Sequence, residues 1–147
     1  MTRTQNLPTR QRRREAPALG MGEEVYLAAP KSEYGSPRYA RLVALTRKHF
    51  PDAEVIEART AFSDTADWRA SWPDILATLS ALVFLTTEAG WIGRGVWAEI
   101  REARDLGLPI YRLTDRGRLV PLPDLTFSRP NPEDWTAHVR VTVANGG

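Results

Sequence analysis

Residues 81–113 read ALVFLTTEAGWIGRGVWAEIREARDLGLPIYRL, and this stretch decides the fold. Residues 81–86 predict a strand, because the first five of them are apolar, and residues 109–113 predict another. Between them, residues 95–106 have the spacing of an amphipathic helix, followed by a glycine and, two residues beyond, a proline. A strand, a helix and a second strand in this order are typical of a parallel sheet covered by helices.

The same alternation extends toward the N-terminus. Residues 25–29 form a continuous apolar run, which is typical of a strand buried on both faces. Ser36 and Pro37 predict the start of a helix, and residues 54–58 and 72–79 predict a weaker strand and a further helix. We therefore predict a single α/β domain: a three-layer sandwich with a mostly parallel central sheet, Rossmann-like and with a flavodoxin-like strand order.

The C-terminal part is less regular. Residues 119–128 predict an irregular extended region, and residues 132–143 predict a last helix. In open parallel sheets, ligands bind beyond the carboxyl ends of the strands. We therefore expect a binding crevice among the loops that follow residues 29, 58, 86 and 113.

Charge is unevenly distributed along the chain. The 147 residues have a formal net charge of +2, and residues 1–22 alone contribute +4 through five arginines and one glutamate. The predicted domain, residues 23–147, therefore carries −2, whereas the basic tail has too few apolar groups to order and is expected to be disordered. This distribution argues against nucleic acid as a partner. An RNA- or membrane-binding tail and a native start at Met21 are the alternatives for the tail.

The composition excludes several kinds of site. Without cysteine the chain has no disulfide, thiolate nucleophile or cysteine-bound metal, and its two histidines argue against a multi-histidine metal centre. We expect neither a metal ion nor an organic cofactor. No apolar run reaches the roughly 18 residues of a membrane span, so we expect a cytoplasmic protein that binds no membrane.

Glu99 is the first candidate for a catalytic residue. In the predicted helix, Val96, Ile100 and Ala103 define an apolar stripe, and Glu99 falls at its edge. No basic residue lies three or four positions from Glu99, so nothing on the helix balances its charge. A carboxylate in this setting, beside the strand-end crevice, is a candidate catalytic group with a perturbed pKa. The alternative is that Glu99 reaches solvent or interacts with the helix dipole.

Other residues near the predicted crevice have both functional and structural interpretations. Gly93 and Gly95 let backbone N–H groups approach a phosphate or a sugar oxygen at the helix start, although a tight turn explains them equally well. Asp74 follows Ser71 in an S-x-x-D pattern that is also typical of a helix N-cap. Tyr26 lies inside the first strand, where a buried tyrosine is usually part of the core.

Three short motifs, taken together, resemble those of a known family. They are the first strand with its proline, VYLAAP at residues 25–30, an aspartate that opens the helix before the third strand, Asp74, and Gly95-x-x-x-Glu99 with Ala103 four positions on. This combination resembles the nucleoside 2-deoxyribosyltransferase-like family and covers about residues 23–113. The family includes transferases that exchange bases on 2'-deoxyribose and N-hydrolases that cleave 5'-phosphorylated nucleosides.

The resemblance implies roles for three residues. Glu99 would be the nucleophile that attacks the anomeric carbon, Asp74 the acid that helps protonate the departing base, and Tyr26 the hydroxyl that orients the glutamate. An N-glycosidic bond breaks through an oxocarbenium-like state, which a carboxylate stabilises or traps covalently. The resemblance also implies a homo-oligomer in which a neighbouring subunit completes the site. Residues 127–131 and the helix that contains Trp135 are candidates for that contribution.

The sequence departs from the family at two positions. Gly93 stands where transferases often have an aspartate that contacts a sugar hydroxyl, and Ser80 stands where they have another aspartate. Lys31, Arg38 and Arg94 in the expected crevice could favour a 5'-phosphate, which points toward the hydrolase branch. Trp91 and Trp97 could stack on the base. Solvated surface charge and core packing are the alternative interpretations. The residues expected to bind substrate are Ala29, Pro30, Lys31, Arg38, Trp91, Gly93, Arg94 and Gly95.

Two other functions fit the same pattern. The related Toll/interleukin-1 receptor-like folds use a glutamate to cleave NAD or a signalling nucleotide, so a glycohydrolase of that class is one alternative. A nucleotide-binding sensor that has lost turnover is the other, and the glycine and serine at the two departing positions favour it.

Overall fold

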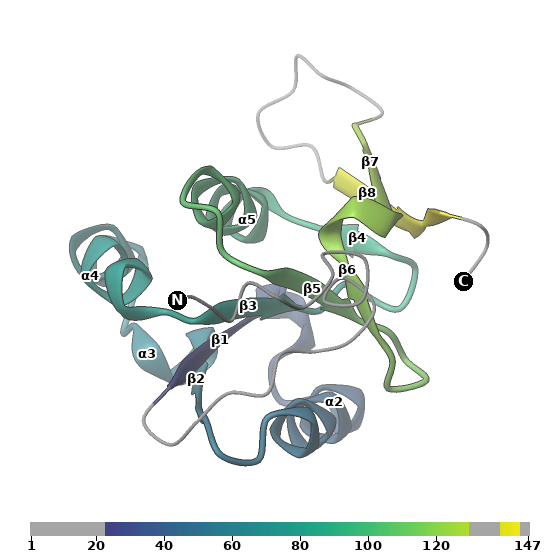
Figure 1. Ribbon diagram of the computed structural model, residues 1–147, viewed down its shortest axis with the longest axis horizontal. Coiled ribbons are helices and arrows are strands. Elements are labelled where there is room, and N and C mark those ends of the chain that lie inside the picture. Colours follow the sequence, from purple (N-terminus) through teal and green to yellow (C-terminus); the bar gives the residue numbers. More distant parts are fainter. Residues whose placement is uncertain (1–22, 130–138, 145–147) are drawn as a thin grey trace, which may run out of the picture.

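The computed structural model describes residues 23–129 and 139–144, which form two β-sheets and several helices (Figure 1). The larger sheet contains four parallel strands and one antiparallel strand at its edge. Its parallel strands have the predicted flavodoxin-like order, in which the first strand lies between the second and the third. In spatial order the strands are β2 (Glu54–Glu57), β1 (Glu24–Ala28), β3 (Ala81–Phe84), β5 (Ile110–Leu113) and β6 (Leu119–Pro121).

Three long helices cover this sheet. α2 (Pro37–His49) lies against one face, and α4 (Thr65–Thr78) and α5 (Arg94–Asp105) lie against the other (Figure 1). Side chains of β1 alternate between the faces: Leu27 packs in the α2 core, whereas Tyr26 packs in the core beneath α4 and α5. This arrangement confirms the predicted α/β class with three layers.

The ends of α2 and α5 follow the signals in the sequence. Ser36 caps α2, because its hydroxyl accepts a hydrogen bond from the Tyr39 N–H at 3.0 Å. α5 ends at a left-handed glycine, Gly107, with φ of +76°, and the Gly107 N–H bonds the Arg104 carbonyl at 2.9 Å. The predicted starts of α2 and α5 and the predicted end of α5 are therefore confirmed to within one residue.

The helix before β3 is longer than predicted. It begins at Thr65, where the Asp64 side chain accepts a hydrogen bond from the Asp67 N–H at 2.8 Å, and it continues through Pro73. The prediction of a start near residue 72 was wrong because Ser71 and Pro73 imitate a helix N-terminus. Because Asp64 caps the helix, Trp68 is helical and lies one turn before Trp72. Both indoles therefore face the sheet.

A small second sheet was not predicted. β4 (Trp91–Ile92), β8 (Val139–Val143) and β7 (Leu125–Ser128) pair antiparallel in the order β4-β8-β7. The predicted last helix was therefore wrong over residues 139–143, where buried valines alternate with exposed residues at the period of a strand. The rest of that segment, with Trp135, and the tail of residues 1–22 lie outside the described residues. Short connecting turns are η2 (Lys31–Glu33), α3 (Ala58–Ala61) and η3 (Leu122–Asp124).

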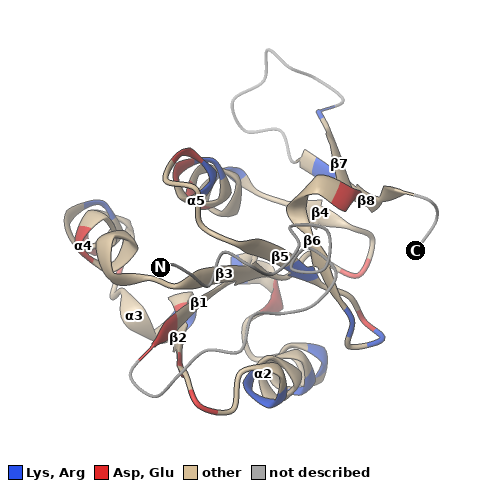
Figure 2. Ribbon diagram, viewed as in Figure 1, with Lys and Arg blue, Asp and Glu red and all other residues tan. Residues whose placement is uncertain are grey.

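Acidic and basic side chains are interspersed over this structure. Figure 2 shows both signs on α5 and in the turn between β5 and β6. Among the described helices, none has the length and apolar content needed to cross a membrane. Within the same residues, no group of three or more histidine or carboxylate side chains could hold a metal ion.

Candidate active site

The Glu99 carboxylate lies in a buried hydrogen-bonded cluster built by three elements. Glu99 stands in the second turn of α5, and only 4% of its surface is exposed. The Tyr26 hydroxyl, from β1, donates to Glu99 Oε2 at 2.5 Å, and the Trp68 indole N–H, from α4, donates to the same oxygen at 2.7 Å. The fold thus holds one carboxylate oxygen with two donors that are distant in sequence.

Burial gives Glu99 an unusual proton affinity. Desolvation raises the pKa of this carboxyl to about 7, although the hydrogen bonds from Tyr26 and Trp68 lower it and the charge of Glu102 raises it slightly. Near neutral pH, both protonation states of Glu99 are populated. Burial, together with the charge of Glu99, raises the pKa of Tyr26, so this hydroxyl remains protonated and can donate.

The two oxygens of Glu99 differ in their surroundings. Both donors bond Oε2, and in the described part of the chain no residue donates a hydrogen bond to Oε1. Aromatic rings surround the cluster: the Tyr26 ring lies 4.8 Å from that of Trp72 and 6.4 Å from that of Phe62, measured between centroids. An oriented carboxylate among aromatic rings, with one oxygen lacking a described donor, can act as a nucleophile or stabilise a developing cation.

Two residues that interact with Glu99, one by a hydrogen bond and one through its charge, were not identified from the sequence. Trp68 lies before residue 72, where the helix is predicted to start, and the Asp64-x-x-Asp67 helix start would have revealed it. Tyr34 follows η2 in the loop after β1, and burial and the charge of Glu99 both raise its pKa. The rule that strand-end loops surround a crevice would have indicated Tyr34.

Asp74 is not brought to Glu99. It lies exposed on α4, two residues after Trp72, and therefore points away from the sheet-facing side of that helix. The expectation that Asp74 opens this helix was wrong, because the helix starts at Thr65. The nearby carboxylate that does influence Glu99 is Glu102, which accepts a hydrogen bond from the Trp72 indole N–H at 3.1 Å.

Arg38 is already engaged by carboxylates. Its guanidinium lies 2.9 Å from Glu33 Oε1 and 2.5 Å from Asp115 Oδ1, and it also donates to the Thr86 carbonyl oxygen at 2.9 Å. The hydrogen bond to Asp115 raises the pKa of Arg38 and lowers that of the carboxyl. Arg38 therefore ties together the loops after β1, β3 and β5, and its charge is compensated without a phosphate.

The other expected substrate-binding residues divide between strand ends and the start of α5. Ala29 is buried and Pro30 half-buried after β1, and Lys31 is exposed in η2. Trp91 is half-buried in β4, with the Arg140 guanidinium 5.7 Å from its ring centroid. Gly93 is the half-buried N-cap of α5, the helix that carries Glu99. Arg94 and Gly95 lie exposed in its first turn.

Comparisons with known proteins give no family. No known protein family matches the sequence, and no curated protein matches it. Among solved structures, a conserved protein from Enterococcus faecalis V583 is 22% identical, with a TM-score of 0.49 over 62% of each chain. This likeness is too low to carry a functional conclusion.

Replacing Arg38 with glutamine is expected to lower the free energy of unfolding by about 1–2 kcal/mol, because three acceptors lose a charged donor. Urea denaturation at pH 7 measures this change. Arg47→Gln on the same helix is the matched control, since Arg47 also pairs with a carboxylate, Glu57 at 3.0 Å, but its side chain is 53% exposed. Equal losses in the two variants would contradict a structural role particular to Arg38.

Proposed function

We propose that the protein cleaves the N-glycosidic bond of a 2'-deoxynucleoside or of its 5'-phosphate, by hydrolysis or by transfer to another base. The observation that carries this proposal is the buried Glu99 carboxylate, held by Tyr26 and Trp68 through one oxygen. The motifs around Tyr26 and Glu99 that resemble the nucleoside 2-deoxyribosyltransferase-like family support the same reaction. We also propose that the enzyme is cytoplasmic and forms a homo-oligomer. Light scattering would test the oligomeric state.

The chemistry follows from the two oxygens of Glu99. Oε1 attacks the anomeric carbon as the bond to the base breaks, and the base leaves with the electron pair and takes up a proton. Water then displaces the carboxylate to release the free sugar, or an acceptor base displaces it to form a new nucleoside, and the attacking water or base gives up a proton. Tyr26 acts as a positioning residue, because it holds Oε2 and favours the ionised form of the nucleophile.

Protonation of the departing base requires a second group. The exposed position of Asp74 argues against the role that the family resemblance implies for it. Tyr34, in the loop after β1, is the alternative that we propose, because its hydroxyl can donate a proton and the charge of Glu99 acts on it. Comparing Tyr34→Phe with Asp74→Asn on the rate of base release distinguishes the two.

The reaction is tested by incubating the protein with each deoxynucleoside and each monophosphate, with and without an acceptor base. Chromatography of the released bases is expected to show turnover of at least one substrate, and formation of a new nucleoside identifies transfer. A parallel incubation with NAD tests the glycohydrolase alternative through nicotinamide release. Absence of base release from every deoxynucleoside and monophosphate would show that the proposed reaction is wrong.

A nucleotide-binding sensor is the second candidate, and it is favoured by the low exposure of Glu99, 4%, in a protein whose Asp74 points to solvent. Isothermal titration calorimetry distinguishes the two functions. A sensor binds a nucleotide saturably without forming product, and Glu99→Ala leaves that behaviour unchanged in kind.

Tyr26→Phe is expected to shift the pH dependence of base release. The hydroxyl stabilises the ionised carboxylate, so its removal raises the pKa of Glu99 above about 7. The pH of half-maximal rate on the acid side should therefore rise by roughly one unit. Initial rates between pH 5 and 9 measure the shift, and Tyr39→Phe, which removes a hydroxyl bonded to Glu57, is the matched control. A lower rate with an unchanged profile would contradict this role for Tyr26.

A further inference from the structure

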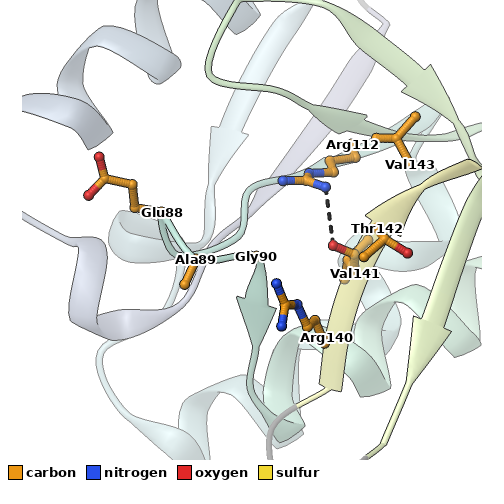
Figure 3. A pocket seen from close by; sticks show the side chains of 8 residues that line it. All are labelled: Glu88, Ala89, Gly90, Arg112, Arg140, Val141, Thr142 and Val143. Carbon is orange, nitrogen blue, oxygen red and sulfur yellow. Dashed lines mark hydrogen bonds between the residues drawn. The ribbon is translucent and has the colours of Figure 1, made fainter. Parts of the chain in front are cut away.

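A pocket of about 300 Å³ lies between the end of the large sheet and the small sheet. The loop before β4, the end of β5 and strand β8 form its walls (Figure 3). Its lining does not include Glu99, Tyr26 or Trp68, so it is distinct from the candidate active site. Its volume is at the lower end of the range for small-molecule sites.

Arg112 enters this pocket without a carboxylate partner. Its guanidinium donates to the Val141 carbonyl and to Thr86 Oγ1, both at 3.3 Å, and its Nε is buried with no hydrogen-bond partner in the described residues. None of the ion pairs among those residues includes Arg112. Burial lowers the pKa of Arg112, the charge of Asp115 raises it, and the charge of Arg38 lowers it. The Asp115 carboxylate itself bonds Arg38. A bound anion would compensate the charge of Arg112.

A second guanidinium faces the same space. Arg140, on β8 next to Val141, directs its side chain toward Gly90 (Figure 3). Glu88 also lines the pocket, but its side chain points away from both guanidinium groups (Figure 3). The pocket is therefore lined by two guanidinium groups and by a carboxylate that does not neutralise them.

Gly90 keeps the pocket wall close to β8. It has φ of +94°, and its carbonyl accepts a hydrogen bond from the Val141 N–H at 2.8 Å. A Cβ at this position would lie 3.1 Å from the Val141 carbonyl oxygen. Glycine thus allows the loop to approach the strand that carries Arg140.

We propose that this pocket binds the phosphate group of a small anionic ligand, with Arg112 and Arg140 as its cationic contacts. Guanidinium groups donate paired hydrogen bonds to phosphate oxygens, and two such groups match the charge of a phosphate dianion. Exposed Ala89 and half-buried Val143 provide apolar side chains at the pocket lining for the remainder of an organic phosphate. The proposal does not depend on the reaction proposed for Glu99.

Isothermal titration calorimetry with inorganic phosphate at constant ionic strength tests this site. The wild-type protein should bind one phosphate saturably, and Arg112→Gln and Arg140→Gln should each weaken binding roughly tenfold or more. Arg101→Gln is the matched control. Arg101 and Arg140 are both exposed and both lie 5.7 Å from a tryptophan ring centroid, but Arg101 is outside the pocket.

Several outcomes decide the proposal. Because Arg140 is exposed, its variant tests the site even if Arg112→Gln does not fold. Glu99→Gln should leave phosphate binding unchanged, so failure of one proposal does not imply failure of the other.

Tighter binding of a nucleoside 5'-monophosphate would identify a nucleotide as the source of the phosphate, and equal binding would identify free phosphate. Absence of saturable binding by the wild type, equal affinity for acetate, or an equal loss in Arg101→Gln would overturn the proposal.

Discussion

Glu99→Gln is expected to reduce base release from a deoxynucleoside substrate by roughly a thousandfold or more, which corresponds to about 4 kcal/mol of transition-state stabilisation. The amide keeps the size of the side chain and an oxygen that can accept hydrogen bonds from Tyr26 and Trp68. It cannot act as a carboxylate nucleophile or stabilise a developing positive charge. Initial rates with saturating substrate at pH 8, where wild-type Glu99 is mostly ionised, measure the loss.

Glu102→Gln is the matched control for this prediction. Glu102 lies on the same helix, undergoes the same chemical change and is exposed. Its charge raises the pKa of Glu99, so the control should retain activity and extend it slightly toward lower pH. If Glu99→Gln releases base as fast as the wild type, or if both variants lose activity equally, Glu99 is not the nucleophile.

The sequence predicted the large sheet well because its signals are local. Continuous apolar runs identify buried strands, and Ser36 and Gly107 identify helix ends through hydrogen bonds made within a few residues. The failures occurred where a local signal competed with packing. Pro73 is typical of a helix start, yet the helix begins at Thr65 and packs both Trp68 and Trp72 against the core.

The candidate site was predictable only in part. The edge position of Glu99 on an apolar stripe indicated a buried carboxylate, and the family resemblance indicated its pairing with Tyr26. The sequence did not place Trp68 beside Glu99, because the two residues are 31 positions apart. Trp68 also lies in the part of α4 that was not predicted to be helical. The carboxylate partners of Arg38 likewise come from distant segments, so their proximity arises from tertiary structure.

The free energy of unfolding is expected to fall by roughly 3 kcal/mol as the pH rises from about 4.5 to about 7, through Glu99 alone. The unfolded chain loses this proton near the ordinary pKa of glutamic acid, whereas the folded protein retains it up to the raised pKa. Protonation therefore stabilises the folded state, and this contribution is complete below about pH 4.5 and absent above about pH 7. Urea denaturation at closely spaced pH values measures the slope.

This slope can be separated from other titrations because the carboxyls with lowered pKa act in a different range. The hydrogen bond from Arg38 lowers the pKa of Asp115 below its ordinary value of 3.8, so the stability contributed by that pair is lost only as the pH falls below about 4. The two effects have opposite signs and occupy separate pH windows. Glu99→Gln should therefore flatten the profile above pH 4.5 and leave the acid limb in place, whereas Glu102→Gln should preserve the fall between pH 4.5 and 7. An identical pH profile for the wild type and Glu99→Gln would mean that the Glu99 carboxyl titrates near its ordinary pKa, and that its burial does not create the environment on which the proposed chemistry depends.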